Sequence, residues 1–180
     1  MNKALETALK ENLTKRAVGT SALRNQVRRG GIRAVHDFLC GLQPRELRAL
    51  RSRKAFLGWL DARTNEMERQ VGKSHGLMWG SARKSLNLWI RDTVYNHHFR
   101  STYGLDRLEP WLEVSLDSHT AAFIRRESVT HLPRWTTIMA VTPALSGVYQ
   151  DAARGIVESP RFAYLKHPVH LDLASWRQED

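Results

Sequence analysis

Apolar residues recur every three to four positions along almost the whole chain, which is the spacing of one face of an α-helix. No run alternates apolar and polar residues in the manner of a half-buried strand. The pattern therefore predicts an all-α protein. Helices are expected over residues 4–18, 32–39, 44–50, 55–69, 83–99, 118–126, 143–156 and 170–176, with a turn-rich connection over residues 72–80.

Two helix starts have clear signals. Thr142 followed by Pro143 combines a good capping residue with a proline at the first helical position. Asp117 precedes Ser118 and a run of apolar positions, so it is expected to cap the helix that follows.

The helix over residues 83–99 is predicted to have two distinct faces. Its apolar residues lie together on one side, at Leu86, Trp89, Ile90 and Val94. Lys84 and Arg91 are seven residues apart on the opposite side, with Asn87 between them, so both cations should point the same way.

The length and composition place the chain among ordinary globular proteins. At 180 residues it is most simply a single domain, long enough to bury a core without disulfides or metal. Cys40 is the only cysteine, which excludes an internal disulfide, a four-cysteine iron–sulfur cluster and zinc sites built from cysteines. The histidines are scattered, so neither a metal site nor a cofactor is expected.

No apolar run approaches the length that crosses a bilayer, and the first residues lack the apolar segment of a secretory signal. We therefore expect no membrane partner and a cytoplasmic, nucleoid-associated location.

The net charge of +10 is concentrated in the first third of the chain. Residues 1–60 hold 13 Lys and Arg against 4 Asp and Glu, whereas residues 61–180 hold 15 against 14. A segment of this kind attracts a phosphate backbone through counterion release, although a solvated basic face is the alternative interpretation. The residues expected to contact DNA are Arg24, Arg28, Arg29, Arg33, Arg48, Arg51 and Arg83.

Several motifs follow one another in a distinctive order along the chain. A glycine-bearing turn leads into Arg83-Lys84-Ser85, and Asp117 opens a later apolar helix. Tyr149-Gln150-Asp151-Ala152-Ala153-Arg154 follows, and then His170-Leu171-Asp172 with Trp176. This order resembles the helix-hairpin-helix DNA glycosylases, and the archaeal 8-oxoguanine DNA glycosylases most closely, with His170-Leu171-Asp172 and Trp176 as the most specific match. The resemblance covers about residues 76–178, leaving residues 1–60 as a strongly basic helical part of the same domain.

The resemblance implies an all-helical enzyme that binds duplex DNA and removes a flipped, damaged or modified purine similar to 8-oxoguanine, with an associated abasic-site lyase activity. Lys84 would be the nucleophile and Asp117 the assisting carboxylate. Arg91, Asp172 and Trp176 would bind the extruded base. No cofactor is implied.

The chemistry of these residues agrees with such roles. A lysine attacks carbon only as a neutral amine, and nearby cations such as Arg83 and Arg91 would lower the pKa of Lys84. An aspartate at a helix N-terminus stays ionised and can stabilise a cationic sugar. Trp176, one turn after Asp172, would give a stacking face beside a hydrogen-bond acceptor.

Several alternatives stay open at this point. Each site residue has a structural interpretation, as a solvated lysine, a helix cap or a core tryptophan. In a second register Lys84 matches a pocket lysine and Leu77 takes the nucleophile position, which would make the protein inactive. The stretch Ser81-Ala82-Arg83 also lacks the glycine that the family has before its lysine.

Two alternative functions follow. The protein could be a catalytically silent DNA-binding or assembly subunit with other protein partners. It could also be a ribonuclease of the HEPN type, because Arg91-Asp92-Thr93-Val94-Tyr95-Asn96-His97 fits the spacing of the arginine and histidine in those enzymes.

Overall fold

The computed structural model describes residues 2–176, apart from the side chains of Thr20, Ser21 and Trp176. Within that range all regular structure is helical, which confirms the predicted all-α class. No helix among the described residues is both long and apolar enough to cross a bilayer.

The chain forms two lobes, each with its own hydrophobic cluster. The N-terminal lobe consists of α1 (Lys3–Ala17), α2 (Thr20–Leu23), α3 (Gly31–Gly41), α4 (Pro44–Leu47), α5 (Arg53–His75), α6 (Trp79–Tyr95), α7 (His97–Tyr103) and the 3₁₀ helix η1 (Leu105–Trp111). The C-terminal lobe consists of α8 (Ser118–Glu127), η2 (Ile138–Ala140), α9 (Pro143–Val157), η3 (Pro160–Phe162), η4 (Pro168–His170) and α10 (Leu171–Trp176). Residues 112–116, called the crossover below, connect the lobes.

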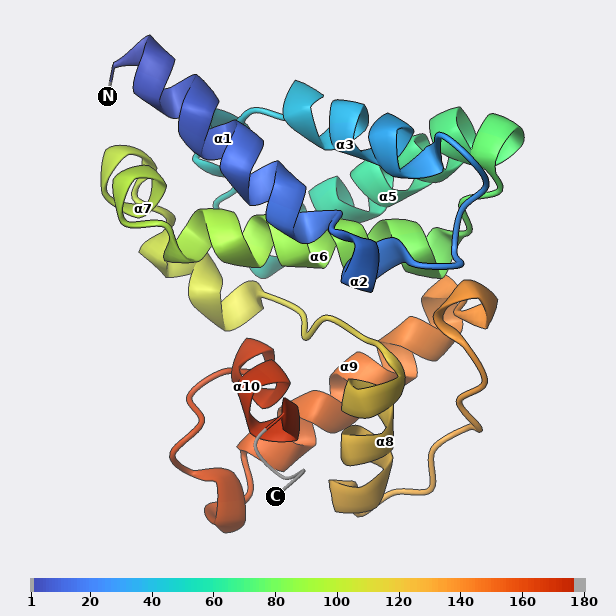
Figure 1. Ribbon diagram of the computed structural model, residues 1–180. Helices are drawn as coiled ribbons and strands as arrows, with labels where there is room; N and C mark the ends of the chain where they lie inside the picture. The colour runs from blue at the N-terminus through green and yellow to red at the C-terminus, as the bar shows by residue number, and fades with distance from the viewer. Residues whose placement is uncertain (1, 177–180) are drawn as a thin grey trace.

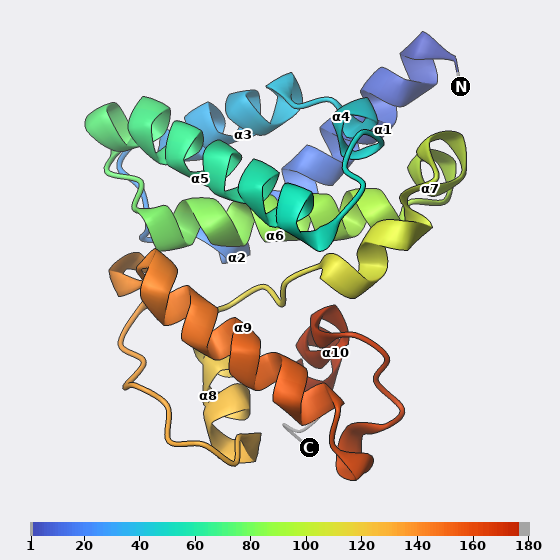
Figure 2. The same ribbon diagram turned by 180° about the vertical axis from the view of Figure 1, so that it is seen from behind.

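Helix α6 runs across the middle of the molecule, with α1, α3 and α5 on one side and α8, α9 and α10 on the other (Figure 1). The view from behind shows the same arrangement, with α5 and α9 now in front (Figure 2). The apolar face of α6 belongs to the N-terminal cluster through Leu86, Trp89, Ile90 and Val94, as predicted. Its polar face is not solvated, because the C-terminal lobe covers it: Lys84 is 9% exposed and Asn87 5%.

The turn before α6 differs from the sequence prediction. Residues 72–80 are not one connection, because α5 continues to His75 and α6 begins at Trp79. Gly76 makes the turn with φ of 70°, a left-handed conformation that suits glycine and ends α5. The start of α6 was misplaced at Arg83 because Met78, its N-cap residue, makes no side-chain capping bond that would mark it. Lys84 therefore lies in the second turn of α6 and not at its mouth.

Gly80 is needed for close packing and not for a turn. A Cβ atom built on Gly80 would lie 2.1 Å from the carbonyl oxygen of Ile138, so α6 and η2 can approach only because this residue has no side chain.

The predicted helix over residues 83–99 is divided at Asn96, whose backbone is extended and whose side chain accepts hydrogen bonds from the N–H groups of His98 and Phe99. Asparagine competes for backbone partners in this way, so it begins α7 instead of continuing α6. The predicted helix over residues 44–50 is also shorter and ends at Leu47.

Two of the predicted helix starts are confirmed in detail. The Asp117 side chain accepts a hydrogen bond from the N–H of Thr120 at the start of α8. The Thr142 side chain does the same for Leu145, one turn into α9.

Candidate active site

Helix α6 presents a row of side chains toward the C-terminal lobe. Lys84, Leu88 and Arg91 succeed one another at intervals of four and three residues, and all three line the same cleft. The prediction that Lys84 and Arg91 share a face is therefore correct.

Asp117 reaches this row from the C-terminal lobe. Its Oδ2 atom lies 3.4 Å from Nζ of Lys84, and its Oδ1 atom accepts the N–H of Thr120 at 3.0 Å. Each carboxylate oxygen thus has its own partner, so the residue caps α8 and faces the lysine at the same time. The functional and the structural interpretations of Asp117 do not compete.

Asp172, at the start of α10, faces the other end of the row. It forms an ion pair with Nη1 of Arg91, whose Nε also donates to Asp92 at 3.0 Å. Asp172 is 9% exposed. Burial raises the pKa of this carboxyl, and the neighbouring charge of Asp117 raises it further, whereas Arg91 and Lys84 oppose the shift.

The charged side chains of Lys84, Arg91, Asp117 and Asp172 border an open cleft of about 540 Å³ between the lobes. That volume lies within the range of roughly 300–1,000 Å³ that small-molecule sites occupy. The cleft therefore has room for a planar group the size of a nucleobase beside the amine and both carboxylates.

Several residues of the cleft wall were not predicted from the sequence. Arg16 comes from α1, Gln26 from the loop after α2, His119 from α8 and Ile138 from η2. The Gln26 amide nitrogen donates to the carbonyl of Ala22, and its Oε1 is buried without a partner among the described residues. No local pattern marks these positions, because they reach the cleft only through the packing of distant segments.

The base-binding role predicted for Trp176 lies outside the described residues, since only the backbone of this residue is described. That backbone belongs to α10, one turn after Asp172.

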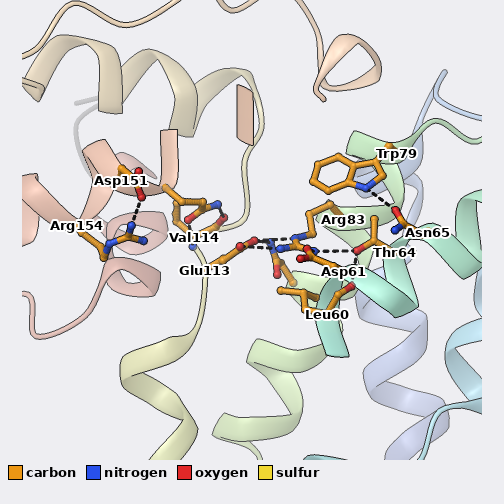
Figure 3. Close-up of polar contacts among 12 residues, drawn as sticks. Leu60, Asp61, Thr64, Asn65, Trp79, Arg83, Glu113, Val114, Asp151 and Arg154 are labelled. Atoms are coloured by element: carbon orange, nitrogen blue, oxygen red, sulfur yellow. Dashed lines mark hydrogen bonds and ion pairs between the residues drawn. The ribbon is translucent and has the colours of Figure 1, made fainter. Parts of the chain in front are cut away.

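Arg83 does not line this cleft. Its buried guanidinium lies instead in a network with Glu113, Asp61 and Thr64 (Figure 3). Its guanidinium donates to both oxygens of Glu113, at 2.8 and 2.9 Å, and to Asp61 at 2.7 Å. It also lies 5.3 Å from the centre of the Trp79 ring. Burial alone would lower the pKa of Arg83, but the bonds and charges of Glu113 and Asp61 outweigh it and raise the pKa. We therefore leave Arg83 out of the residues proposed to contact DNA.

The other predicted DNA-contacting arginines form two separate groups. Arg24, Arg28 and Arg29 lie in the loop before α3, where the N–H of Arg28 donates to the carbonyl of His75 at the end of α5. Arg48 and Arg51 precede the start of α5. An α-helix of 23 residues is about 34 Å long, so the two groups lie at opposite ends of α5. Arg33, in α3 on the side of the first group, is paired with Asp37.

The arginine and histidine of the ribonuclease pattern are divided between two helices. Arg91 lies in α6 with its guanidinium paired to Asp172 and Asp92, whereas His97 is the exposed first residue of α7. Across the described part of the chain, no three His, Cys, Asp or Glu side chains are grouped as metal ligands would be.

Comparison with protein-family models, with curated protein sequences and with solved structures finds no match to this chain. Its function must therefore be argued from the cleft itself.

Proposed function

We propose that this protein binds duplex DNA and removes a damaged or modified purine that has rotated out of the duplex into the cleft. The supporting observation is the pair of Lys84 and Asp117, an amine and a carboxylate from separate lobes that lie 3.4 Å apart in an open cleft. The resemblance to the helix-hairpin-helix glycosylases suggests the same roles for the same two residues.

Asp117 would stabilise the positive charge that develops on the deoxyribose as the base departs. Cleavage of the bond between a purine and its deoxyribose leaves positive charge on the sugar ring, and an ionised carboxylate fixed beside that position stabilises the charge. The hydrogen bond from Thr120 fixes the carboxylate at the end of α8, so little reorganisation is needed during the reaction.

Lys84 would form the covalent intermediate. The bond from C1′ to N9 breaks with its electron pair on the purine, and Nζ forms a new bond to C1′ with its own lone pair. The amine must give up a proton, and Asp117 Oδ2 is within reach to accept it and pass it to the departing base. Opening of the sugar ring then gives an imine, which borohydride reduces to a stable amine.

The wall opposite the sugar would read the base. Asp172 offers an acceptor and Arg91 offers donors on the same cleft. A purine edge presents both donors and acceptors, so a mixed wall of this kind suits it.

Arginines near the mouth would hold the DNA backbone. Arg16 lines the cleft with its side chain 75% exposed, and Arg24 follows α2 directly. Helix α2 lies in front of α6 in Figure 1. Ala22 of this helix and Gln26 just after it line the cleft, so Arg24 is close to the cleft wall in the chain. Cations in this position would attract phosphates through counterion release.

The test is borohydride trapping of the protein on duplexes that contain 8-oxoguanine or an abasic site. We expect a covalent adduct with the wild type, none with Lys84→Gln, and an undiminished adduct with Lys73→Gln. Lys73 is an exposed lysine at the end of α5 and serves as the matched control. Trapping that survives loss of Lys84 would refute its role as nucleophile.

A catalytically silent DNA-binding protein is the second candidate, favoured by the position of the turn before α6. The glycine-bearing turn is Gly76-Leu77-Met78, so Leu77 and not Lys84 lies on it, as in the inactive register. Leu77 is 1% exposed in the N-terminal cluster and has no access to the cleft. DNA binding without base release or trapping on any damaged duplex would establish this candidate.

A further inference from the structure

The Lys84–Asp117 contact spans two lobes, and its geometry leaves little tolerance. The distance of 3.4 Å is at the long end for a charged hydrogen bond. A shift of either lobe by about 1 Å would remove the contact. The crossover leads directly into Asp117, so its position relative to α6 decides whether Asp117 and Lys84 meet.

Glu113, in the crossover, is held by α6 through both of its oxygens. Oε1 accepts from Arg83 at 2.8 Å, and Oε2 accepts from Arg83 at 2.9 Å and from Asn87 at 3.1 Å. The two side chains are almost buried, with Arg83 8% and Glu113 11% exposed. A two-pronged guanidinium–carboxylate contact fixes both distance and orientation.

The next residue of the crossover is held from the other lobe. Gln150 of α9 accepts the N–H of Val114 at 3.0 Å and donates to its carbonyl at 2.9 Å. The crossover is thus fixed between α6 and α9 at two successive residues, four and three positions before Asp117. Figure 3 shows Arg83 and Glu113 meeting between the lobes, with Val114 on the far side.

Arg83 is the immediate neighbour of Lys84, so the same turn of α6 carries the amine and holds the segment that leads into Asp117. We propose that the Arg83–Glu113 ion pair is a positioning device that holds the Asp117 carboxylate against the Lys84 amine. This inference rests on the residue pair of the proposed function, but its test does not require base removal.

The test measures the rate at which trace acetic anhydride acetylates Lys84 in the full-length protein, by mass spectrometry, relative to the exposed Lys73 in the same molecules. An amine paired with a carboxylate is acetylated more slowly than a free one. Asp117→Asn should therefore raise the relative rate severalfold, and Glu113→Gln should raise it to a similar degree.

The double variant separates positioning from general loosening of the fold. If Glu113 acts through Asp117, the variant with both changes should react no faster than Asp117→Asn alone. Asp61→Asn is the matched control, because it removes another carboxylate from Arg83 without touching the crossover. It should leave the relative rate at the wild-type value.

Asn87→Ala provides a milder variant in case Glu113→Gln folds poorly, since it removes one neutral donor to Glu113. Its smaller increase should also vanish in the Asp117→Asn background. The inference is overturned by a wild-type rate in both Glu113→Gln and Asn87→Ala, by effects that add to Asp117→Asn, or by an Asp117→Asn variant that reacts like the wild type. Absence of base release with the expected acetylation pattern would refute the proposed function alone.

Discussion

Arg83 and Lys84 are neighbours in α6, yet their side chains enter opposite environments. The Arg83 guanidinium is enclosed by Glu113, Asp61 and Thr64, whereas the Lys84 amine meets one carboxylate at the edge of an open cleft. Both residues belong to the triplet Arg83-Lys84-Ser85, and nothing in that local sequence separates their environments.

The difference separates two uses of buried charge. The Arg83 guanidinium depends mainly on Glu113, because that carboxylate is almost buried and accepts two of its hydrogen bonds, whereas Asp61 is largely exposed. The Lys84 pair has space beside it for a third molecule, and its carboxylate retains a backbone partner in Thr120. The first network suits the assembly of the lobes, and the second suits chemistry on a ligand.

The largest expected effect tests whether the Arg83 network supports the fold. Glu113→Ala should lower the free energy of unfolding by about 3 kcal/mol, because it removes the buried carboxylate of Arg83 and leaves only the exposed carboxylate of Asp61 as its charged partner. Lys84→Met should lower it by about 1 kcal/mol or less, since the remaining carboxylate faces the cleft. Urea unfolding measures both, and equal losses would erase the distinction between the two cations.

A second effect separates the proposed catalytic role of Asp117 from its role as the N-cap of α8. Asp117→Asn should slow single-turnover base release by about 10²–10³-fold through loss of charge, while an asparagine still caps α8. Asp117→Ala should slow the reaction similarly and also cost about 1 kcal/mol of stability from the lost cap. An unchanged rate in the asparagine variant would leave Asp117 with the structural job alone.

The third effect concerns the pH dependence of Asp172. Because its pKa is raised in the folded protein, mainly by burial, the stability it contributes is complete at acid pH. That contribution is lost as the pH rises from the ordinary range of aspartic acid through the raised value. Asp172→Asn should therefore equal the wild type in stability at acid pH and exceed it at neutral pH. Urea unfolding across that interval measures the difference, and the opposite trend would mean that Arg91 outweighs burial.

The smallest effect compares the cations at the two ends of α5. Changing Arg24, Arg28 and Arg29 to Gln should reduce the salt dependence of DNA binding by about one unit of slope per phosphate contact. Changing Arg48 and Arg51 should reduce the salt dependence less. These two residues lie at the other end of α5 from Arg28, and the loop of Arg28 also carries Gln26 of the cleft wall. Fluorescence anisotropy over a salt series measures both slopes. Point substitutions are needed, since residues 1–60 contribute Leu13, Val35 and Leu39 to the core.

Local signals predicted much of the secondary structure and part of the cleft. Asp117 and Thr142 cap the helices that follow them because capping depends on a side chain and the backbone a few residues away. The shared face of Lys84 and Arg91 followed from the helical period. The break at Asn96 was missed because one short polar residue does not interrupt the apolar period. The start of α6 was missed because its N-cap residue, Met78, has no side chain that can cap a helix.

The burial of the Arg83 side chain against Asp61 and Glu113 could not be predicted in the same way. Its partners Asp61 and Glu113 are 22 and 30 residues away, and only the packing of α5 and the crossover against α6 brings them together. Gln26 reached the cleft wall for a similar reason.

The sequence by itself determined an all-α chain, the capping aspartate and a helix that carries a lysine and an arginine on one face, because these depend on neighbours within one or two turns. Only the tertiary structure decided which cations are enclosed and which line the cleft, and that the amine meets the carboxylate. Those outcomes depend on distances between lobes, and these distances are set by close packing, such as that of Gly80 against Ile138, which no local period encodes.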